Sequence, residues 1–180
     1  MTNPLCSLRI RMIDPEKPYP ILVSACLLGI RCRYDAEHSL CQELVDFLPR
    51  VCIVPVCPEQ MGGLPTPRPA VNIIGGHGPD VLSGKAKCVN QLNEDVTEAF
   101  VKGAQEALKL AQLTGARIFI GKDKSPSCGM RTPYCDVPEG TGTGVAVALL
   151  EKEGLEVLEL RPQGPFPSPE FDEVIKKTYK

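Results

Sequence analysis

The hydrophobic positions of this chain follow two patterns, and each pattern is typical of one kind of element. Short continuous apolar runs are typical of strands that are buried on both faces; they predict strands at 21–26, 51–57, 116–121 and 155–160. Apolar residues spaced three or four positions apart predict amphipathic helices; these cover residues 38–49, 92–115, 144–154 and 168–177. Two strand-like pieces around a glycine-rich turn predict a β-hairpin over residues 70–87.

Local signals define several of the helix ends. Pro49 closes the first helix, and Gly115 follows the last apolar position of the longest one. Ser168 is a helix cap and Pro169 occupies a first helical position, so the terminal segment is expected to form a short helix. Glycine and proline crowd residues 58–69, which are therefore expected to form a loop with little regular structure.

The alternation of strands and helices predicts an α/β fold in three layers, with a mostly parallel, Rossmann-like sheet. The small β-hairpin is an addition to this sheet. A chain of 180 residues is the size of one domain, and no interior change of composition divides it. We expect an N-terminal tail over residues 1–19, a single domain over 20–162, and a C-terminal extension with a short helix over 163–180.

Charge and hydropathy exclude several classes of protein. The formal net charge is -2, the isoelectric point is about 5.8, and no run of lysine or arginine is present. Nucleic acid is therefore not an expected partner. The longest apolar run, Ile21 to Ile30, is too short for a membrane span. The opening residues also lack the features of a secretory signal, so a cytoplasmic protein is expected.

Nine cysteines are many for such a chain, and an odd number cannot pair completely in disulfides. In a reducing compartment they are expected to be thiols, used in packing, catalysis or metal binding. Three of them lie at predicted strand ends: Cys26 ends the first strand, Cys57 ends the second, and Cys128 lies in the loop after the third. Ligands of open α/β sheets bind at the carboxyl ends of strands, so these three thiols are predicted to converge despite their distance in sequence.

Three thiolates suit a soft metal centre. A structural zinc ion prefers four ligands and commonly uses paired C-x-x-C motifs, and this sequence has no such motif. An iron–sulfur cubane on three cysteines would leave one iron free to act as a Lewis acid, which is typical of an enzyme rather than an electron carrier. A non-catalytic zinc or sulfide-carrying protein is the alternative from another class. A Cys-His dyad has no support, because His38 and His77 show no recognisable spacing to a cysteine.

Polar residues accompany these cysteines. Glu59 stands two residues after Cys57 and could transfer protons, while Ser125 and Ser127 could donate hydrogen bonds next to Cys128. The simpler interpretations are that Glu59 is a solvated loop acid and that Ser125 begins a turn.

The remaining cysteines are interpreted as packing or incidental. Among them Cys135 is the best substitute ligand, because it lies seven residues after Cys128; the others are Cys6, Cys32, Cys41, Cys52 and Cys88.

Four segments together resemble a known family: "ILVSACLLGIRCRYD", "PVCPEQMGGLPTPRPAVNI", "GKAKCVNQLNEDVTEAFVKGA" and "KDKSPSCGM". They occur in the same order as in bacterial thiouracil desulfidases of the TudS type, formerly a domain of unknown function, and the resemblance runs from about residue 21 to residue 160. The family's reaction removes sulfur from thiolated uracil, such as 2-thiouracil, and gives uracil and hydrogen sulfide without net redox change.

The resemblance implies an oxygen-sensitive 4Fe-4S cluster held by Cys26, Cys57 and Cys128. By similarity, the open iron would take the thiocarbonyl sulfur while an activated water attacks the ring carbon. Glu59 and Ser125 are the implied catalytic residues. Hydroxyl or backbone donors would hold the substrate ring, and Ser24 and Ser127 are the residues expected to bind the substrate.

The resemblance leaves the substrate open. Ala36 stands where the family pattern has glycine, and a related subgroup acts on 4-thiouridine in tRNA with the help of an added domain. This chain has neither that domain nor a basic face, so a small thiolated pyrimidine or its nucleotide is the expected partner. Either a monomer or a homodimer is compatible with the sequence.

Overall fold

The computed structural model describes residues 19–47, 52–138, 141–163, 166 and 168–178. The expected tail therefore lies outside the described residues up to position 18, and so does the predicted helix stop at Pro49. The strands are β1 (Pro20–Ser24), β2 (Cys52–Val56), β3 (Val71–Ile74), β4 (Lys87–Asn90), β5 (Ile118–Lys122) and β6 (Glu156–Leu160). The helices are η2 (Ala25–Leu28, 3-10), α1 (Gln42–Phe47), α2 (Pro58–Met61), α3 (Gly78–Leu82), α4 (Thr97–Thr114), α5 (Val145–Lys152) and α6 (Pro169–Thr178).

Four strands form a parallel sheet in the order β2-β1-β5-β6, and β3 pairs with β4 in a separate antiparallel pair. This arrangement confirms the predicted α/β class with its parallel sheet and added hairpin. Because β1 and β5 are central, both of their faces are buried, which explains their continuous apolar sequences.

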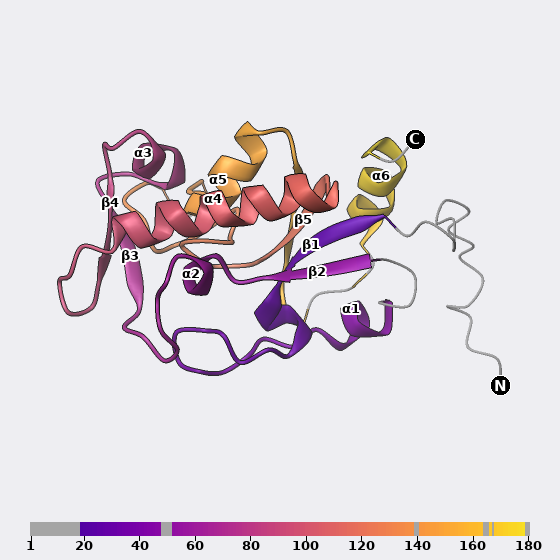
Figure 1. Cartoon of the computed structure of the whole chain (residues 1–180), viewed down its shortest axis with the longest axis horizontal. Coiled ribbons are helices and arrows are strands. Elements are labelled where there is room, and N and C mark those ends of the chain that lie inside the picture. Colours follow the sequence, from indigo (N-terminus) through magenta and orange to yellow (C-terminus); the bar gives the residue numbers. More distant parts are fainter. Residues whose placement is uncertain (1–18, 48–51, 139–140, 164–165, 167, 179–180) are drawn as a thin grey trace.

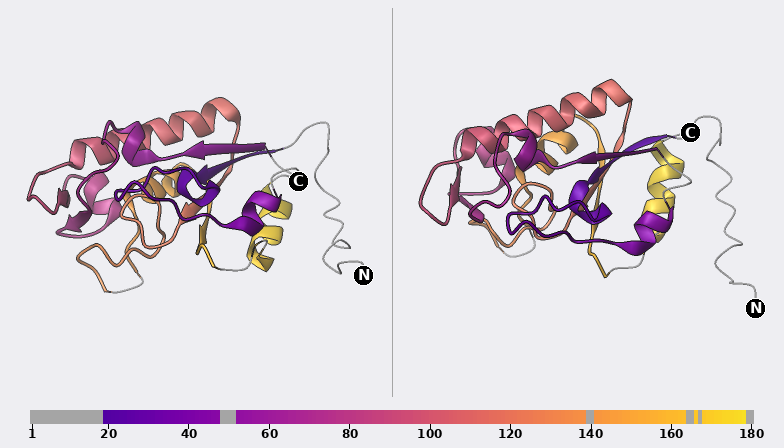
Figure 2. Two further views of the ribbon diagram at one scale, coloured as in Figure 1. Left: turned by 90° about the horizontal axis from the view of Figure 1, so that it is seen from below. Right: turned by 60° about the horizontal axis from the view of Figure 1, so that its bottom comes forward.

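Alternate residues of the central strands enter different cores. Ile21 and Val23 of β1 pack with α1 and α6, where Phe47 and Phe171 meet edge to face at 5.4 Å between ring centroids. Leu22, one position away, packs on the opposite face with residues of α4 and α5. The left view of Figure 2 shows the result: α4 lies on one side of the sheet, and α1 and α6 lie side by side on the other. The predicted three layers are confirmed.

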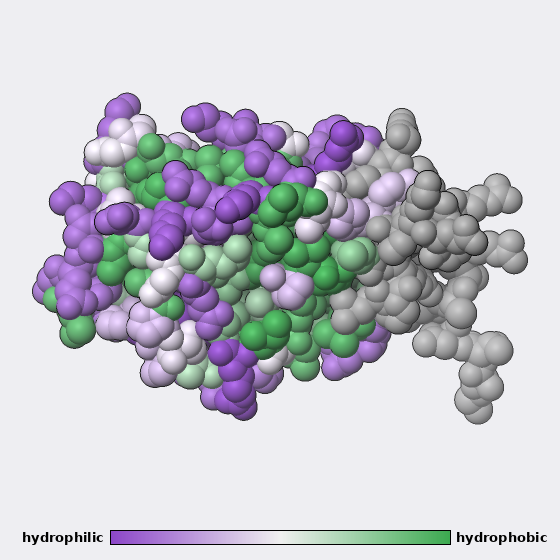
Figure 3. Space-filling view, in the orientation of Figure 1, coloured by the Kyte–Doolittle hydropathy of each residue, from purple (hydrophilic) through white to green (hydrophobic). Residues whose placement is uncertain are grey.

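Helix α4 runs the length of the sheet and reaches the hairpin (Figure 1). Its apolar face buries Phe100, Ala104, Ala107 and Ala111, while hydrophilic residues follow its outer surface (Figure 3). It begins at Thr97 rather than at the predicted residue 92, because the Asn90 side chain accepts the backbone N–H groups of Leu92 and Glu94 and holds this segment as a turn.

The hairpin differs from its prediction in one respect. Its strands pair antiparallel as expected, but helix α3 replaces a simple glycine-rich turn between them. Pro79 in the first turn and a reciprocal cap between His77 and Asp80 start this helix. Likewise, the segment predicted as an irregular loop after residue 57 begins with the single turn α2. Among the described residues, no helix is both long and apolar enough to cross a membrane.

Candidate functional site

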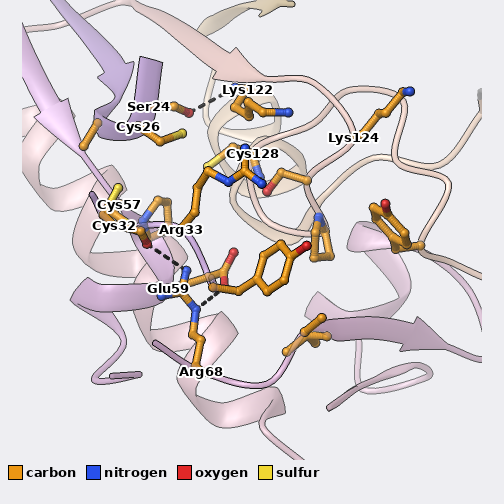
Figure 4. A pocket seen from close by; sticks show the side chains of 18 of the residues that line it. Ser24, Cys26, Cys32, Arg33, Cys57, Glu59, Arg68, Lys122, Lys124 and Cys128 are labelled. Atoms are coloured by element: carbon orange, nitrogen blue, oxygen red, sulfur yellow. Dashed lines mark hydrogen bonds and ion pairs between the residues drawn. The ribbon is translucent and has the colours of Figure 1, made fainter. Parts of the chain in front are cut away.

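A cavity of about 340 Å³ opens at the carboxyl ends of β1, β2 and β5. This is the edge at which open α/β sheets bind ligands, and the volume falls in the range of small-molecule sites. Figure 4 shows thiol groups gathered on one side of this pocket. The residues that line it include Ser24, Cys26, Cys32, Arg33, Tyr34, Cys57, Glu59, Arg68, Lys122, Lys124, Ser125, Cys128 and Tyr134.

The three cysteines predicted from strand ends all line this pocket. Cys26 lies in η2, directly after β1; Cys57 follows β2 and precedes α2; Cys128 lies in the loop after β5. Since β2, β1 and β5 are neighbours in the sheet, their following segments meet at one edge. The geometry is therefore the one that the strand-end argument predicts.

A fourth cysteine, which the sequence assigns to packing alone, belongs to the same group. Cys32 is buried, yet it lines the pocket and lies against Cys26 and Cys57. Hydrogen bonding with the Cys26 thiol, assisted by burial, raises the pKa of Cys32 to about 11. The Cys57 thiol donates to the Cys32 carbonyl oxygen at 3.6 Å. No local signal distinguishes Cys32 in the sequence, because a loop of ordinary composition brings it back to the strand end.

Contact with Cys32 and burial raise the pKa of Cys57 far above its ordinary value. Burial also raises the pKa of Cys128 to about 12, although hydrogen bonds with the hydroxyls of Ser24 and Ser127 partly oppose this change. These raised pKa values keep Cys57 and Cys128 as neutral thiols near pH 7, so a metal that binds them must displace their protons.

Close backbone contacts hold two of the cysteine segments. A Cβ at Gly121 of β5 would overlap the carbonyl oxygen of Cys128, so the loop after β5 lies directly on the strand. On the other side of the pocket, a Cβ at Gly103 of α4 would overlap the carbonyl oxygen of Pro58. The absence of side chains at these two positions thus allows the Cys128 loop to lie against β5 and α2 to lie against α4.

Glu59 is not a solvated loop acid. It lies on α2, lines the pocket, and its Oε2 accepts a hydrogen bond of 2.6 Å from Nε of Arg68. The Arg68 side chain is 3% exposed and that of Glu59 is 14% exposed, so the ion pair is largely removed from water. In Figure 4 the second carboxylate oxygen of Glu59 is directed into the pocket. The sequence gives no signal for Arg68, which stands alone in a proline-rich loop.

The three predicted serines occupy different places. Ser125 lines the pocket, and its Oγ accepts the backbone N–H groups of Ser127 at 3.2 Å and Cys128 at 3.0 Å. Its hydroxyl therefore shapes the Cys128 loop and keeps a proton to donate. Ser24 lines the pocket as well, accepts the N–H of Lys122 at 3.1 Å and hydrogen-bonds Cys128. Ser127 is buried beside Cys128 and does not line the pocket.

The other described cysteines lie elsewhere. Cys135, the predicted substitute ligand, pairs with Ile73 through an isolated backbone β-bridge. Its side chain packs against the apolar cluster of the hairpin, to which the buried Cys88 of β4 also belongs. Cys41 is buried beside α1, and Cys52 is exposed at the start of β2. None of these four lines the pocket.

The donor set indicates what the pocket could hold. Among the described residues, no three Cys, His, Asp or Glu side chains are arranged to bind one metal ion. Thiolates around a single zinc ion, bound at about 2.3 Å, would lie about 3.8 Å apart. A cubane spreads its ligands over several metal atoms and needs a wider ring of thiols. Cysteine sulfurs are soft donors, and the three that line this one cavity have the chemistry that an iron–sulfur cluster requires.

Comparisons with known proteins show which family the chain resembles in sequence and in fold. The sequence profile of a family described as 2-thiouracil desulfurase matches residues 21–160. The chain is 43% identical over 141 residues to YbbK of Bacillus subtilis (strain 168), described as an uncharacterized protein; the match covers 77% of this chain and 93% of YbbK. Its fold matches a solved structure named 4Fe-4S-dependent thiouracil desulfidase TudS, with a TM-score of 0.64 and 34% identity over 78% of this chain and 90% of that one.

Proposed function

The chain belongs to the 2-thiouracil desulfurase family, and from this premise we propose that it is a 4Fe-4S-dependent desulfidase that acts on a thiolated pyrimidine of the 2-thiouracil type. The overall reaction exchanges sulfur for oxygen: the C=S group and water give a C=O group and hydrogen sulfide. Two protons of the water leave with the sulfide, no electron is gained or lost, and no redox partner is required.

The observation that carries this proposal is the joint lining of one pocket by Cys26, Cys57, Cys128 and Glu59. Cys26, Cys57 and Cys128 are the residues that would hold the cluster. When bound, a cluster with an open iron supplies a soft Lewis acid that polarises the C=S bond and stabilises the departing sulfide. Cys32 would lie beside two of the ligands, within the same group of thiols.

The polar side chains supply the proton transfers and the orientation. Glu59 is the proposed general base: its oxygen that faces the cavity takes a proton from the attacking water while the other oxygen is held by Arg68. Ser125 keeps a proton to donate after its oxygen has accepted two backbone N–H groups, so it is suited to hold a ring oxygen or nitrogen.

The roles of Ser24 and Ser127 follow from their neighbours. Both hydroxyls hydrogen-bond Cys128, and such bonds orient a metal ligand. Ser24 also reaches the cavity and could contact substrate there, whereas Ser127 would act through Cys128. Tyr34 and Lys124 also line the pocket and could contact the substrate there.

The test is an anaerobic preparation of the full chain. We expect a brown protein that contains iron and acid-labile sulfide and converts 2-thiouracil to uracil with one sulfide released per turnover. Product and sulfide are measured by chromatography and a colorimetric assay. A colourless protein that takes up zinc after anaerobic reconstitution, and leaves 2-thiouracil intact, would instead support the non-catalytic metal protein.

A further inference from the structure

Arg68 has more buried polar contacts than any simple surface role requires. The residue is 8% exposed, and its guanidinium donates through all three nitrogens. Nε binds Glu59, Nη2 binds the carbonyl oxygen of Cys32 at 3.1 Å, and Nη1 binds the carbonyl oxygen of Pro65 and the hydroxyl of Thr66, each at 3.1 Å. A buried cation is costly unless it is paired and hydrogen-bonded, and here both conditions are met.

The contacts of the two Nη atoms fix the orientation of the guanidinium independently of Glu59. Two backbone carbonyl oxygens and one hydroxyl, on two separate loops, hold the Nη atoms, so these acceptors set the direction of the Nε–H bond without help from Glu59. The short bond to Oε2 then sets the rotation of the carboxylate. As a consequence Oε1 is the oxygen that faces the cavity, as Figure 4 shows.

The same guanidinium connects Glu59 to the thiols. The Cys32 carbonyl oxygen that accepts Nη2 of Arg68 also accepts the Cys57 thiol. Arg68 therefore links Glu59 on α2 to the loop that carries Cys32. Arg33, the other arginine of the pocket, donates to Asp35 and Ser39 instead, so it does not share this task.

We propose that Arg68 is a positioning residue that orients the Glu59 carboxylate for proton transfer from the attacking water. The inference rests on the proposed function, since it assigns Glu59 the role of general base. Displacement of a base by about 1 Å can reduce the rate about a hundredfold. Substrate contacts are unchanged in this scheme, so the loss should appear in kcat and not in KM.

The experiment is a double-mutant cycle on the cluster-loaded full chain. We compare the unmodified protein with Arg68→Gln, Glu59→Gln and the double variant, and measure kcat per iron cluster, KM and iron content. Arg31→Gln is the matched control, because Arg31 forms an exposed ion pair with Glu37 at 2.9 Å and does not line the pocket.

We expect Arg68→Gln to lower kcat about a hundredfold with KM changed less than about threefold. The double variant should be no slower than Glu59→Gln alone, whereas Arg31→Gln should match the unmodified protein. Losses that multiply in the double variant, or an unchanged kcat per cluster in Arg68→Gln, would overturn the inference.

A milder variant covers the possibility that Arg68→Gln fails to fold. Arg68→Lys retains the charge but can satisfy only part of the guanidinium's acceptors, so its kcat should lie between those of the unmodified protein and Arg68→Gln. An unchanged kcat per cluster in Arg68→Lys, with only a lower melting temperature, would assign Arg68 a structural role alone. Absence of turnover in the unmodified protein would reject the proposed function itself.

Discussion

Two groups of cysteines in the described part of the molecule differ in their surroundings, and one of them has the features of a reactive site. The sheet-edge cysteines, which are Cys26, Cys32, Cys57 and Cys128, line one cavity and include thiols in mutual contact. The hairpin cysteines, Cys88 and Cys135, pack in one cluster of apolar side chains, and neither of them lines the cavity.

Burial therefore does not separate the two sets. Cys88 is fully buried, and this burial raises its pKa to about 12, much as it does for Cys128. The difference is position: the sheet-edge cysteines follow neighbouring parallel strands, whereas Cys88 lies within a strand of the hairpin. A cysteine buried within a hairpin strand, as Cys88 is, serves as a small hydrophobic side chain.

The strongest test of this contrast is removal of single thiols. Cys26→Ala, Cys57→Ala and Cys128→Ala should each abolish cluster retention and with it all turnover. Cys88→Ala and Cys135→Ala should keep iron, sulfide and kcat per chain within about twofold, because their thiols fill apolar space. Iron and acid-labile sulfide per chain after anaerobic purification provide the measurement. Loss of iron in Cys135→Ala would reverse the assignment.

The second largest effect is expected from replacing Glu59 at the sheet edge, compared with Glu94 at the hairpin. Glu59→Gln should retain the cluster and lower kcat by about 10² to 10⁴, the contribution typical of a general base. Glu94→Gln is the matched change at the hairpin, where the Glu94 carboxylate accepts a hydrogen bond of 2.7 Å from the Asn90 amide. That variant should turn over at the normal rate. Steady-state kinetics normalised to iron content distinguish the two, and equal activity of both would remove Glu59 from the mechanism.

Close backbone contacts offer a third comparison. In Gly103→Ala the new methyl group would overlap the backbone of α2, and in Gly78→Ala it would overlap Gly144 and Ala148. Each change should cost about 1 to 3 kcal/mol of the free energy of unfolding. Only Gly103→Ala should also reduce kcat, since α2 carries Glu59. Denaturant unfolding and kinetics on the same samples test this, and a normal kcat in Gly103→Ala would show that α2 tolerates the shift.

The smallest expected effect is the pH-dependent contribution of Asp95, near the hairpin, to the stability of the folded state. Hydrogen bonds from the hydroxyl and N–H of Thr97, and the ion pair with Lys87, lower the pKa of Asp95 to about 2. The folded state thus favours the ionised form, so its stabilisation is present above pH 4 or so and is lost as the pH falls towards 2.

Asp95→Asn should therefore be less stable at pH 7 by about 0.5 kcal/mol or less, because the ion pair is exposed to solvent. The difference from the unmodified protein should vanish near pH 2, and turnover at pH 7 should be unchanged. Thermal unfolding midpoints across this pH range provide the check. A difference that persists at pH 2 would point to a steric cause instead.

Much of the fold could be predicted from local sequence. The segment around Ile21 and that around Ile118 are continuous apolar runs because both faces of a central parallel strand are buried, so their type follows from composition alone. Short elements were harder to predict: α2 and α3 each depend on a proline in the first turn and on packing against α4 or α5, which a periodicity of apolar residues cannot reveal.

The sequence by itself determined the three layers and the placement of Cys26, Cys57 and Cys128 at strand ends, because strand type and the shared edge of parallel strands follow from the order of elements. Only the tertiary structure decided that Cys32 joins them and that Arg68 holds Glu59. The physical reason is that these contacts connect loops whose path depends on long-range packing. The ion pair between Glu59 and Arg68 joins residues nine positions apart, and no hydrophobic pattern in the sequence indicates it.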